Sequence, residues 1–484
     1  MNRFCFVLAT LLAPLFATAE AATKPNIILI LADDLGWRDL GCYGSTFHET
    51  PNLDKLAAQG MRFTQAYAAC PVCSPPRASI MTGKYPARLK LTNFIGGERS
   101  GKLLPAPYLH QLPLAELTIA EALKESAYTT GHFGKWHLGG KGFLPEDQGF
   151  EVSFGAANGA GAPPTYFFPY APKANPAQKL LPDGMPGEYL TDRLTDEAIK
   201  FIKASKDNPF FLYLPHYAVH VPLEGKAGLV EKYRKKKEAM KPVPGPRFLP
   251  EGQNEARQIQ DHAVYAAMME SLDDSVGRIM AVLVELKLDE NTVVIFTSDN
   301  GGLSTAEGSP TSNVPLRGGK GWLYEGGIRE PLIVKWPGVT QPGSVSDHMV
   351  ISNDFYPTLL EIAGAPAKPR QHMDAVSFAA VLRGREQLER TPLFWHYPHY
   401  ANQGGYPGGV VRAGDFKLIE NYEDMRVELF NLKDDLGEKT DLAAKMPEKV
   451  EELRKLLHDW RKSVDATMPT PNPAKLGHVD VGVD

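Results

Sequence analysis

Several apolar runs in this chain end abruptly in polar residues, and this pattern limits the possible folds more than any other feature. The runs comprise residues 27–31, 210–214 and 293–296, and residues 128–133 give a weaker strand signal. Unbroken rather than alternating apolar residues indicate strands buried on both faces, as in a parallel sheet covered by helices. Apolar residues at helical spacing separate them, in residues 117–125, 190–203 and 262–288. The alternation predicts a doubly wound α/β domain with a large, mostly parallel sheet flanked by helices.

Polar side chains follow each run at the point where the predicted strand ends. They are Asp33 and Asp34, then Lys135 and His137, then His216 and His220, then Asp299 and Asn300. In doubly wound sheets, ligands bind beyond the carboxyl ends of the strands. Each residue alone is compatible with a surface loop, but four such coincidences favour one shared cleft.

The acidic pairs predict a metal site. Asp33, Asp34, Asp299 and Asn300 offer only hard oxygen ligands, which suit Ca²⁺ or Mg²⁺ rather than zinc. Such an ion would polarise a substrate oxygen as a Lewis acid. The alternatives are a helix cap for the Asp-Asp pair and a turn for Asp-Asn-Gly. Because both pairs end apolar runs, the metal site is the better interpretation.

The run Cys73-Ser74-Pro75-Pro76-Arg77, which continues to Thr82-Gly83, predicts a nucleophile facing an anion pocket. The paired prolines are suited to the first turn of a helix, so Cys73 should lie just ahead of its N-terminus. Unpaired N–H groups and the helix dipole attract anions there, and Arg77 adds a positive charge. The alternative is a loop with a buried structural cysteine. Cys70 and Cys73 also spell CxxC, but no second CxxC completes a zinc site, and we treat this pattern as coincidental.

This run resembles the Cys-x-Pro-x-Arg…Thr-Gly signature of the type I, formylglycine-dependent sulfatases of the arylsulfatase family. The resemblance implies that a maturation enzyme oxidises Cys73 to formylglycine (3-oxoalanine), whose hydrated form attacks sulfur. It implies an alkaline-phosphatase-like catalytic fold. It also implies that Asp33, Asp34, Asp299 and Asn300 bind Ca²⁺, with Mg²⁺ as the second choice, and that residue 73 completes the metal shell.

Three further segments resemble family motifs and imply the remaining roles. Residues 134–137 match Gly-Lys-Trp-His, in which Lys135 contacts the sulfate and His137 helps to break down the sulfated intermediate. Residues 218–222 match Ala-Pro-His-x-Pro, with Val219 in place of the first proline, and carry His220, the donor to the leaving oxygen. Residues 316–321 carry Lys320, which should hold sulfate together with Arg77 and Lys135.

The composition and the N-terminus indicate the class and destination of the protein. A formal net charge of −5, from 52 basic and 57 acidic residues, argues against a nucleic-acid partner. Residues 1–21 read as a signal peptide, with Arg3, an apolar stretch at 4–16 and small residues at the cleavage site. This stretch is too short for a membrane span, and no later segment is long enough. We therefore expect a secreted or periplasmic protein, with an uncleaved anchor as the alternative.

The pattern of apolar and polar residues changes beyond about Pro392. Short strand-like pieces at 416–419 and 427–430 precede a helical segment at 447–464. We therefore predict a catalytic domain at 22–385 and a smaller α+β domain with an antiparallel sheet at 386–484. His396 and His399 of the second domain could line a sugar site, although packing at the domain interface explains these aromatic-rich residues equally well.

Together these features predict a sulfuric ester hydrolase that removes sulfate from a sulfated carbohydrate, of galactose or N-acetylgalactosamine type. Lys135, His220 and Lys320 would contact this substrate. One alternative is a formylglycine-dependent phosphonate or phosphodiester hydrolase of the same superfamily. Another is an inactive protein that binds sulfated glycans. The sequence leaves open which sugar is used and whether Cys42 and Cys70 pair.

Overall fold

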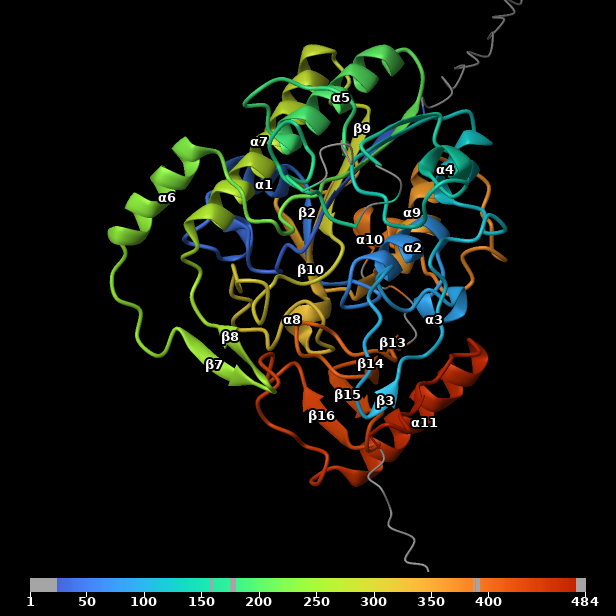
Figure 1. Ribbon diagram of the computed structural model, residues 1–484. Coiled ribbons are helices and arrows are strands. Elements are labelled where there is room, and N and C mark those ends of the chain that lie inside the picture. Colours follow the sequence, from blue (N-terminus) through green and yellow to red (C-terminus); the bar gives the residue numbers. More distant parts are fainter. Residues whose placement is uncertain are drawn as a thin grey trace, which may run out of the picture.

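The computed structural model describes residues 24–475 except 157–158, 160, 175–179, 386–387 and 389–391. A nine-stranded sheet forms its centre (Figure 1). The strands are β1 (Asn26–Ala32), β2 (Met61–Tyr67), β4 (Thr129–Phe133), β5 (Val152–Phe154), β6 (Phe210–Pro215), β9 (Thr292–Ser298), β10 (Arg329–Lys335), β11 (Ser344–Ser346) and β12 (Val350–Ile351). Their order is β11-β2-β10-β9-β1-β6-β4-β5, and β12 also pairs with β2. The predicted signal peptide lies outside the described residues.

Strand β1 lies in the middle of this sheet and is buried along its whole length. It pairs in parallel with β6 and with β9, as the unbroken apolar runs predict. Successive side chains point to opposite faces, so Ile27 and Leu29 enter one core and Ile28 enters the other. Strand β10 runs antiparallel to its neighbours β9 and β2, so the sheet is mixed at that side. The predicted fold, a mostly parallel sheet flanked by helices, is confirmed.

Helices cover both faces of the sheet (Figure 1). One face carries α2 (Ser74–Thr82), α4 (Ile119–Lys124), α9 (Phe355–Ile362) and α10 (Ala379–Leu382). The other carries α1 (Pro51–Gln59), α5 (Leu190–Ser205) and α7 (Ala263–Glu285). Helix α4 is shorter than its predicted range because Thr118 caps it, accepting from the Glu121 N–H while the Glu121 carboxylate accepts from the Thr118 N–H.

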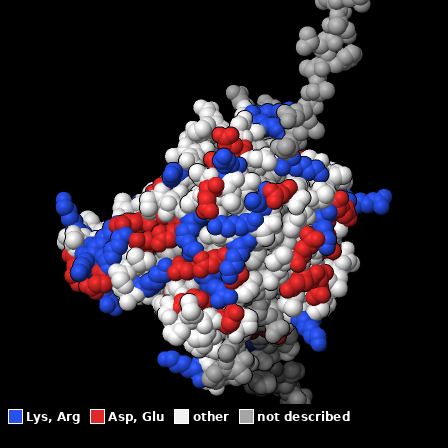
Figure 2. All heavy atoms as spheres, turned by 90° about the horizontal axis from the view of Figure 1, so that it is seen from above, with Lys and Arg blue, Asp and Glu red and all other residues white. Residues whose placement is uncertain are grey.

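Helix α6 (Ala227–Glu238) packs against α7 on the outside of the molecule. It contains a basic run at residues 232–237, and ion pairs neutralise much of it: Lys232 binds Glu49 and Glu270, and Lys236 binds Glu49. Seen from above, positive and negative side chains are interspersed (Figure 2). This run is therefore a solvated, paired helix face. Among the described residues, no helix is both long and apolar enough to cross a membrane.

A four-stranded antiparallel sheet follows near the C-terminus, and α11 (Pro447–Ser463) packs on it. Its strands are β13 (Leu393–Tyr397), β14 (Gly408–Ala413), β15 (Phe416–Asn421) and β16 (Val427–Asn431). The core of this sheet is continuous with Trp322 and Tyr67 of the preceding region, and the Trp395 indole donates to the Ala68 carbonyl at 2.7 Å. The domain boundary at 385/386 stays a prediction, since residue 386 is outside the described part.

Short elements complete the chain. They are the helices α3 (Pro86–Leu89) and α8 (Glu325–Ile328), 3-10 turns at 41–43, 145–148 and 352–354, the pair β3 (Leu103–Leu104) and β17 (Thr470–Pro471), and the hairpin of β7 (Phe248–Glu251) with β8 (Asn254–Arg257). The pairing of β3 with β17 joins the end of the described chain to the loop that follows α3. Two regions that are distant in sequence are thereby fixed side by side.

Candidate active site

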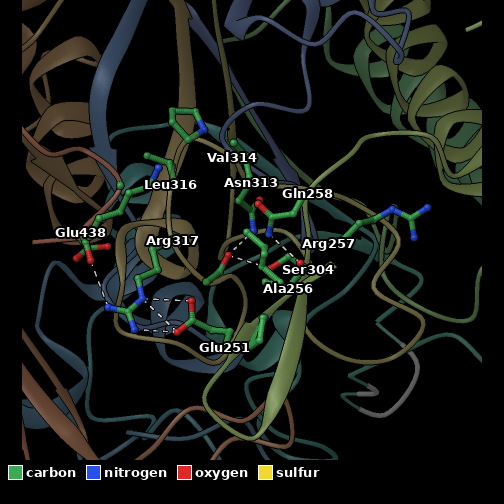
Figure 3. A pocket seen from close by; sticks show the side chains of 16 residues that line it. Glu251, Ala256, Arg257, Gln258, Ser304, Asn313, Val314, Leu316, Arg317 and Glu438 are labelled. Atoms are coloured by element: carbon green, nitrogen blue, oxygen red, sulfur yellow. Dashed lines mark hydrogen bonds and ion pairs between the residues drawn. The ribbon is translucent and has the colours of Figure 1, made fainter. Parts of the chain in front are cut away.

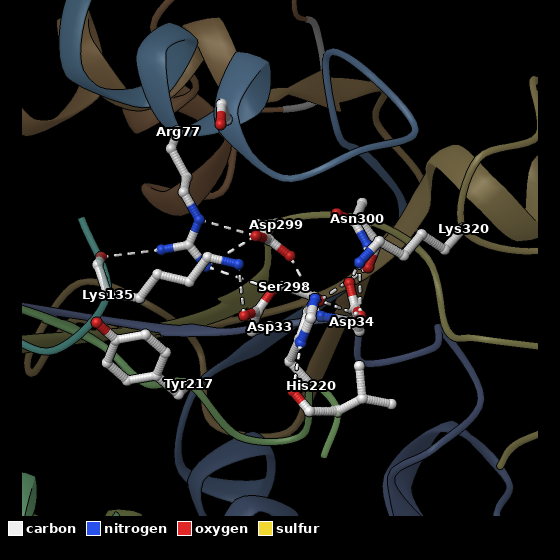
Figure 4. Close-up of polar contacts among 12 residues, drawn as sticks. Asp33, Asp34, Arg77, Lys135, Tyr217, His220, Ser298, Asp299, Asn300 and Lys320 are labelled. Carbon is white, nitrogen blue, oxygen red and sulfur yellow. Dashed lines mark hydrogen bonds and ion pairs between the residues drawn. The ribbon is translucent and has the colours of Figure 1, made fainter. Parts of the chain in front are cut away.

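The polar residues that follow the central strands meet in one buried cluster (Figure 4). Asp33 and Asp34 follow β1, Lys135 follows β4, His220 follows β6, and Asp299 follows β9. Parallel strands place their carboxyl ends at the same edge of the sheet, which explains the convergence. Three carboxylates and three cations lie within the protein, each at most 4% exposed: Asp33, Asp34, Asp299, Arg77, Lys135 and Lys320.

Each of the two adjacent aspartates holds a lysine. Lys135 Nζ donates to Asp33 Oδ2 at 2.7 Å, and Lys320 Nζ donates to Asp34 Oδ2 at 2.7 Å. Burial alone raises the pKa of Asp34, but the amine of Lys320 outweighs this effect and holds the pKa well below its usual range. Asp34 has a φ of 61°, a left-handed conformation that is rare outside glycine. The backbone is therefore bent to turn this carboxylate toward Lys320.

Arg77 joins the third carboxylate to the first. Its Nε and Nη2 atoms lie 2.8 and 2.7 Å from Asp299 Oδ2, and its Nη1 donates to the Lys135 carbonyl at 3.1 Å. Arg77 Nη2 also lies 3.7 Å from Asp33 Oδ1. Burial and the neighbouring Asp33 raise the pKa of Asp299 to about 6. The guanidinium thus fixes the carboxylate and the lysine loop in one arrangement.

Cys73 is the N-cap residue of α2 and is only 3% exposed. The helix begins at Ser74, one residue before the paired prolines, so both prolines lie in its first turn, where a missing N–H costs little. Burial alone would raise the pKa of the Cys73 thiol. The positive charges of Lys135 and Lys320 oppose burial, and the net result is a pKa lowered to about 7. The predicted position of Cys73 ahead of a helix N-terminus is confirmed. Within the described part of the chain, Cys42, Cys70 and Cys73 are free thiols.

Two histidines with different electrostatic surroundings border the cluster. His220 Nε2 lies 3.6 Å from Asp34 Oδ2, and its Nδ1 lies 2.7 Å from the Val221 carbonyl. Burial lowers the pKa of His220, but Asp34 and Asp33 outweigh this and raise it. The pKa of His137 is shifted in the opposite direction, because burial and Lys135 lower it well below the ordinary value. One imidazole therefore favours its charged form and the other its neutral form.

A tyrosine that the sequence motifs do not single out supports the His220 loop. The hydroxyl of Tyr166 lies 2.6 Å from the Tyr217 carbonyl and 2.8 Å from the His220 carbonyl, and donates to them. Tyr166 is fully buried in a Gly- and Pro-rich segment of the sequence. The aromatic content of that segment is the only sequence signal for this role, and it does not point to one residue.

The oxygen atoms in the cluster suit a divalent cation. Asp33 Oδ1 and Asn300 Oδ1 are buried and accept no hydrogen bond from the described residues, which is costly unless another group binds them. Ligand atoms of Asp33, Asp34, Cys73 and His220 all lie within 4.8 Å of one another. Asp299 is not in this compact group, because Oδ2 binds Arg77 while Oδ1 accepts from the Asp34 N–H at 3.2 Å. The oxygens of Asp33, Asp34, Asp299 and Asn300 suit a hard ion, whereas the compact group also includes the Cys73 sulfur and a His220 nitrogen.

His396 and His399 lie at the junction of the two sheets. His396 Nδ1 is 2.8 Å from the Tyr422 hydroxyl and its Nε2 is 3.0 Å from the Thr467 carbonyl. His399 Nε2 is 2.8 Å from the Thr92 hydroxyl, and the ring is fully buried. His399 reaches Thr92 of the catalytic region, as the interface alternative predicts, whereas both partners of His396 lie in the C-terminal region. A sugar-binding role for them stays a prediction.

A separate cavity of about 380 Å³ lies beside the β7–β8 hairpin (Figure 3). Arg317 and Glu251 form a bidentate ion pair in its wall, with Arg317 Nη2 2.9 Å from Glu251 Oε1. Arg317 Nη1 also donates to the Glu438 carbonyl at 3.2 Å. The side chains that line this cavity do not include the predicted catalytic ones, all of which lie among the described residues. It backs the segment that leads to Lys320 and is distinct from the buried cluster.

The chain thus combines a mostly parallel α/β fold with a buried cluster of three carboxylates and three cations at its strand ends. The sequence profile described as Sulfatase matches residues 25–365, and that described as N-sulphoglucosamine sulphohydrolase, C-terminal, matches residues 319–464. A protein of Formosa agariphila named Sulfatase is 37% identical, over 90% of this chain and 88% of its own. The N-acetylgalactosamine-6-sulfatase of Canis lupus familiaris is 34% identical, over 81% of this chain and 72% of its own.

Solved structures agree with the sequence comparisons. One described as Ps i-CgsB in complex with k-i-k-neocarrahexaose has a TM-score of 0.73 at 30% identity and covers 90% of this chain and 93% of its own. The chain therefore belongs to the sulfatase family, and it is a sulfuric ester hydrolase.

Proposed function

We propose that this enzyme removes sulfate from a sulfated carbohydrate, using a formylglycine at position 73 and a bound Ca²⁺ ion. The observation that carries the proposal is the geometry around Cys73. It stands at the start of α2, and the buried cations Lys135 and Lys320 act on its thiol. Such a pocket is complementary to an anion and to the charge that develops on its oxygens in the transition state.

Asp33, Asp34, Asp299, Asn300 and residue 73 would hold the metal ion, with Ca²⁺ preferred to Mg²⁺. The ion, when bound, would supply Lewis-acid polarisation of a sulfate oxygen. The unfilled oxygens of Asp33 and Asn300 support this assignment. With the carboxylates neutralised by the ion, Lys135 and Lys320 would be available to the sulfate group, and Arg77 would keep Asp299 in place.

Formylglycine at position 73 would supply, in its hydrated form, a hydroxyl nucleophile for attack on sulfur. The chain's own groups then align the reaction. The amines of Lys135 and Lys320 bind the sulfate oxygens and hold the ester in line with residue 73. Catalysis of this kind depends mostly on positioning and charge stabilisation, by analogy with phosphoryl transfer.

The two histidines divide the proton transfers. His220, whose pKa is raised in the presence of Asp34 and Asp33, is suited to donate a proton to the departing alcohol oxygen. His137, whose pKa is lowered by burial and by Lys135, is suited to accept a proton from the side chain at position 73. A pair of titratable groups with opposite shifts is the usual arrangement for acid and base roles.

The saccharide assignment is supported by the relatives. One relative is named N-acetylgalactosamine-6-sulfatase, and a solved structure at 30% identity is described in complex with a neocarrahexaose. A galactose or N-acetylgalactosamine unit is therefore the substrate class that we propose. We also propose that residues 1–21 export the protein, so that it meets extracellular or periplasmic polysaccharide.

Two measurements test the proposal. Mass spectrometry of the peptide that contains residue 73, from a host with the maturation enzyme, should show the aldehyde and its hydrate. An unmodified thiol in fully active protein would exclude the mechanism. Parallel assays on 4-nitrophenyl sulfate and bis(4-nitrophenyl) phosphate should show a strong preference for the sulfate. A preference for the phosphodiester would instead support the alternative function, and binding of sulfated glycan without any turnover would indicate an inactive binding protein.

A further inference from the structure

A carboxylate from the segment after β9 lies close to the candidate sulfate-binding lysine. The Lys320 N–H donates to the Gly302 carbonyl at 3.1 Å, so the two segments run side by side. Five residues further on, Glu307 is half-buried beside the exposed Gly308. Among the acidic groups that act on the Lys320 ammonium, Glu307 is the one that does not belong to the metal and nucleophile cluster. Glu307 is therefore half-buried in a segment that runs beside Lys320.

Two amides from the C-terminal region hold this carboxylate. The Asn402 and Gln403 side-chain amides both donate to the same oxygen, Glu307 Oε1, the latter at 2.8 Å. The other oxygen, Oε2, accepts no hydrogen bond from the described residues. Because the amide nitrogens point at Glu307, the amide oxygens must face other groups. Asn402 Oδ1 and Gln403 Oε1 are indeed buried without a hydrogen-bond partner in the described part of the chain.

The loop that carries these amides is rigidly attached beside Lys320. The backbone carbonyl of Gln403 accepts from Trp322 Nε1 and from the Thr305 hydroxyl, each at 2.9 Å. Gln403 is only 1% exposed, and its Oε1 faces Gly321 so closely that a Cβ added to this glycine would lie 2.6 Å from the oxygen. The acceptor groups are therefore preorganised next to the sulfate pocket rather than free to rotate.

Unfilled acceptors of this kind require hydrogen-bond donors. Glu307 Oε2 can accept from a hydroxyl group, whereas a second sulfate carries only acceptors and would be repelled by the carboxylate. Leaving buried polar atoms unpaired is costly, so a substrate that supplies donors is favoured over one that does not. The chemistry of the cluster therefore distinguishes a free hydroxyl from a sulfated one.

We propose that Glu307, held by Asn402 and Gln403, is a specificity-determining residue that binds a free hydroxyl of the sugar, next to the sulfated position. This inference rests on the proposed saccharide substrate and deepens it. It predicts that a monosulfated sugar is preferred over the same sugar with a second sulfate on the neighbouring carbon. The carboxylate contributes to recognition of the sugar and not to cleavage of the sulfate ester.

The test compares two substrates in the variant Glu307→Gln. A monosulfated galactose substrate presents hydroxyls, whereas 4-nitrophenyl sulfate has none. We expect kcat/KM for the sugar to fall about 10- to 100-fold, mainly through KM, and kcat/KM for 4-nitrophenyl sulfate to stay within about twofold. Glu255→Gln, the same charge change at an exposed position of the β7–β8 hairpin, is the matched control and should affect neither substrate. Equal losses on both substrates would overturn the proposal.

A sugar analogue with the neighbouring hydroxyl replaced by hydrogen sharpens the result. If the contact is direct, removal of the hydroxyl and of the carboxylate should be non-additive, and fully additive losses would contradict it. Binding of the monosulfated sugar to the inactive Cys73→Ala protein, measured by calorimetry, gives a readout independent of turnover. The milder variant Asn402→Ala should weaken this binding too, and serves if Glu307→Gln folds poorly.

If wild-type protein hydrolyses 4-nitrophenyl sulfate but not the sugar, both this subsite and the saccharide assignment fail. If it hydrolyses neither, the proposed function fails with them.

Discussion

Two buried clusters of charge in this protein are built from the same residue types but are completed in different ways. The catalytic cluster contains Asp33, Asp34, Asp299, Arg77, Lys135 and Lys320. The interface cluster contains Glu325, Arg329, Lys417 and Glu438, each at most 5% exposed, and joins the C-terminal sheet to the end of β10. Both take charges out of water, which costs several kcal/mol per ion unless partners compensate.

The interface cluster is closed. Lys417 Nζ lies 3.0 Å from Glu325 Oε1 and 2.8 Å from Glu438 Oε1, and Arg329 Nε donates to Glu325 Oε2 at 2.6 Å. The Glu325 N–H donates to Glu438 Oε2 at 2.7 Å. Every carboxylate oxygen of this cluster therefore lies within 3.0 Å of a cation or an N–H group, although Glu438 Oε1 meets Lys417 as an ion pair without hydrogen-bond geometry.

The catalytic cluster is open. Asp33 Oδ1 and Asn300 Oδ1 accept no hydrogen bond from the described residues, and Asp34 and His137 have left-handed backbone conformations, with φ of 61° and 57°. Such features persist where the surroundings hold them for function. The comparison teaches that burial of charge alone does not mark a site. The predictions below use the difference in partnering between these two clusters.

The largest effect should come from the nucleophile, which only the open cluster has. Cys73→Ala should lower kcat by at least about 10⁴-fold, because loss of a covalent nucleophile removes the reaction path itself. Steady-state assays on 4-nitrophenyl sulfate measure this. Cys70→Ala, a change at a second buried cysteine three residues away, should retain activity. Activity of Cys73→Ala within tenfold of wild type would contradict the assignment.

Breaking the closed cluster should cost stability rather than rate. Lys417→Met leaves two buried carboxylates without their shared cation, so the free energy of unfolding should fall by about 3–5 kcal/mol. Urea denaturation measures the loss, and kcat per folded molecule should stay within about threefold. A large loss of kcat at full stability would mean that the interface cluster acts in catalysis.

A lysine-to-methionine change in the open cluster should have the opposite effect: it should lower the rate and leave the stability nearly unchanged. Lys320→Met should lower kcat by about 10²–10³-fold, the usual cost of removing one group that stabilises transition-state charge. In the presence of Ca²⁺ its urea midpoint should stay close to wild type, since the ion compensates Asp34. An unchanged rate would rule out contact between Lys320 and sulfate.

Metal removal should affect the open cluster alone. Chelation with EDTA should abolish activity and lower the free energy of unfolding by about 3 kcal/mol, the linkage expected for an ion present at about 100 times its Kd. Thermal melting with and without Ca²⁺ measures this shift. Asp33→Asn should lose the shift and Lys417→Met should keep it. If EDTA does not change the melting temperature of the wild-type protein, the proposed metal site is contradicted.

The smallest effect concerns pH at the closed cluster. Burial and Glu325 raise the pKa of Glu438 to about 7, from an ordinary value of 4.5, although Lys417 opposes this. The folded protein then keeps a proton that the unfolded chain has released, so this contribution is fully present below about pH 4.5 and is lost as pH rises through about 7. It amounts to at most about 3 kcal/mol. Urea midpoints at about pH 5 and pH 8 should differ less in Glu438→Gln than in wild type.

A match between these two pH profiles would show that Glu438 is not the group responsible. Other raised carboxyls, such as Asp273 with a pKa of about 6, contribute equally to both proteins and cancel in the comparison.

The sequence predicted the open cluster far better than the closed one, for a physical reason. Asp33 and Asp299 follow strands whose unbroken apolar runs identify a parallel sheet, Lys135 follows a weaker strand pattern, and parallel topology brings the ends of these strands together. Lys417 and Glu438 look like ordinary surface charges, because nothing local indicates that two antiparallel strands will be covered by the catalytic region. The contact between Glu307 and Asn402 also depends on how the C-terminal region packs on the catalytic region, so the sequence does not indicate it.

Within the sheet, the missed elements were those without a continuous apolar run. Strand β2 alternates buried and half-buried residues from Met61 to Thr64, and its neighbour β10 pairs antiparallel, so neither has the signature of a central parallel strand. Helix limits shifted where capping decides them, as at Thr118. The spacing of apolar residues therefore predicts the layers of the fold. The packing of the C-terminal region and the exact helix ends are seen only in the three-dimensional structure.

The burial of Cys73 sets a time limit during biosynthesis. Its sulfur is covered by segments that include Lys320, which leaves the ribosome about 250 residues later. At the usual 5–20 residues per second, the interval is roughly 10–50 s. Under the proposed function, a modifying enzyme would have to reach the thiol within that interval or on a chain that has not yet folded. Faster closure of the nascent protein would trap the unoxidised form permanently.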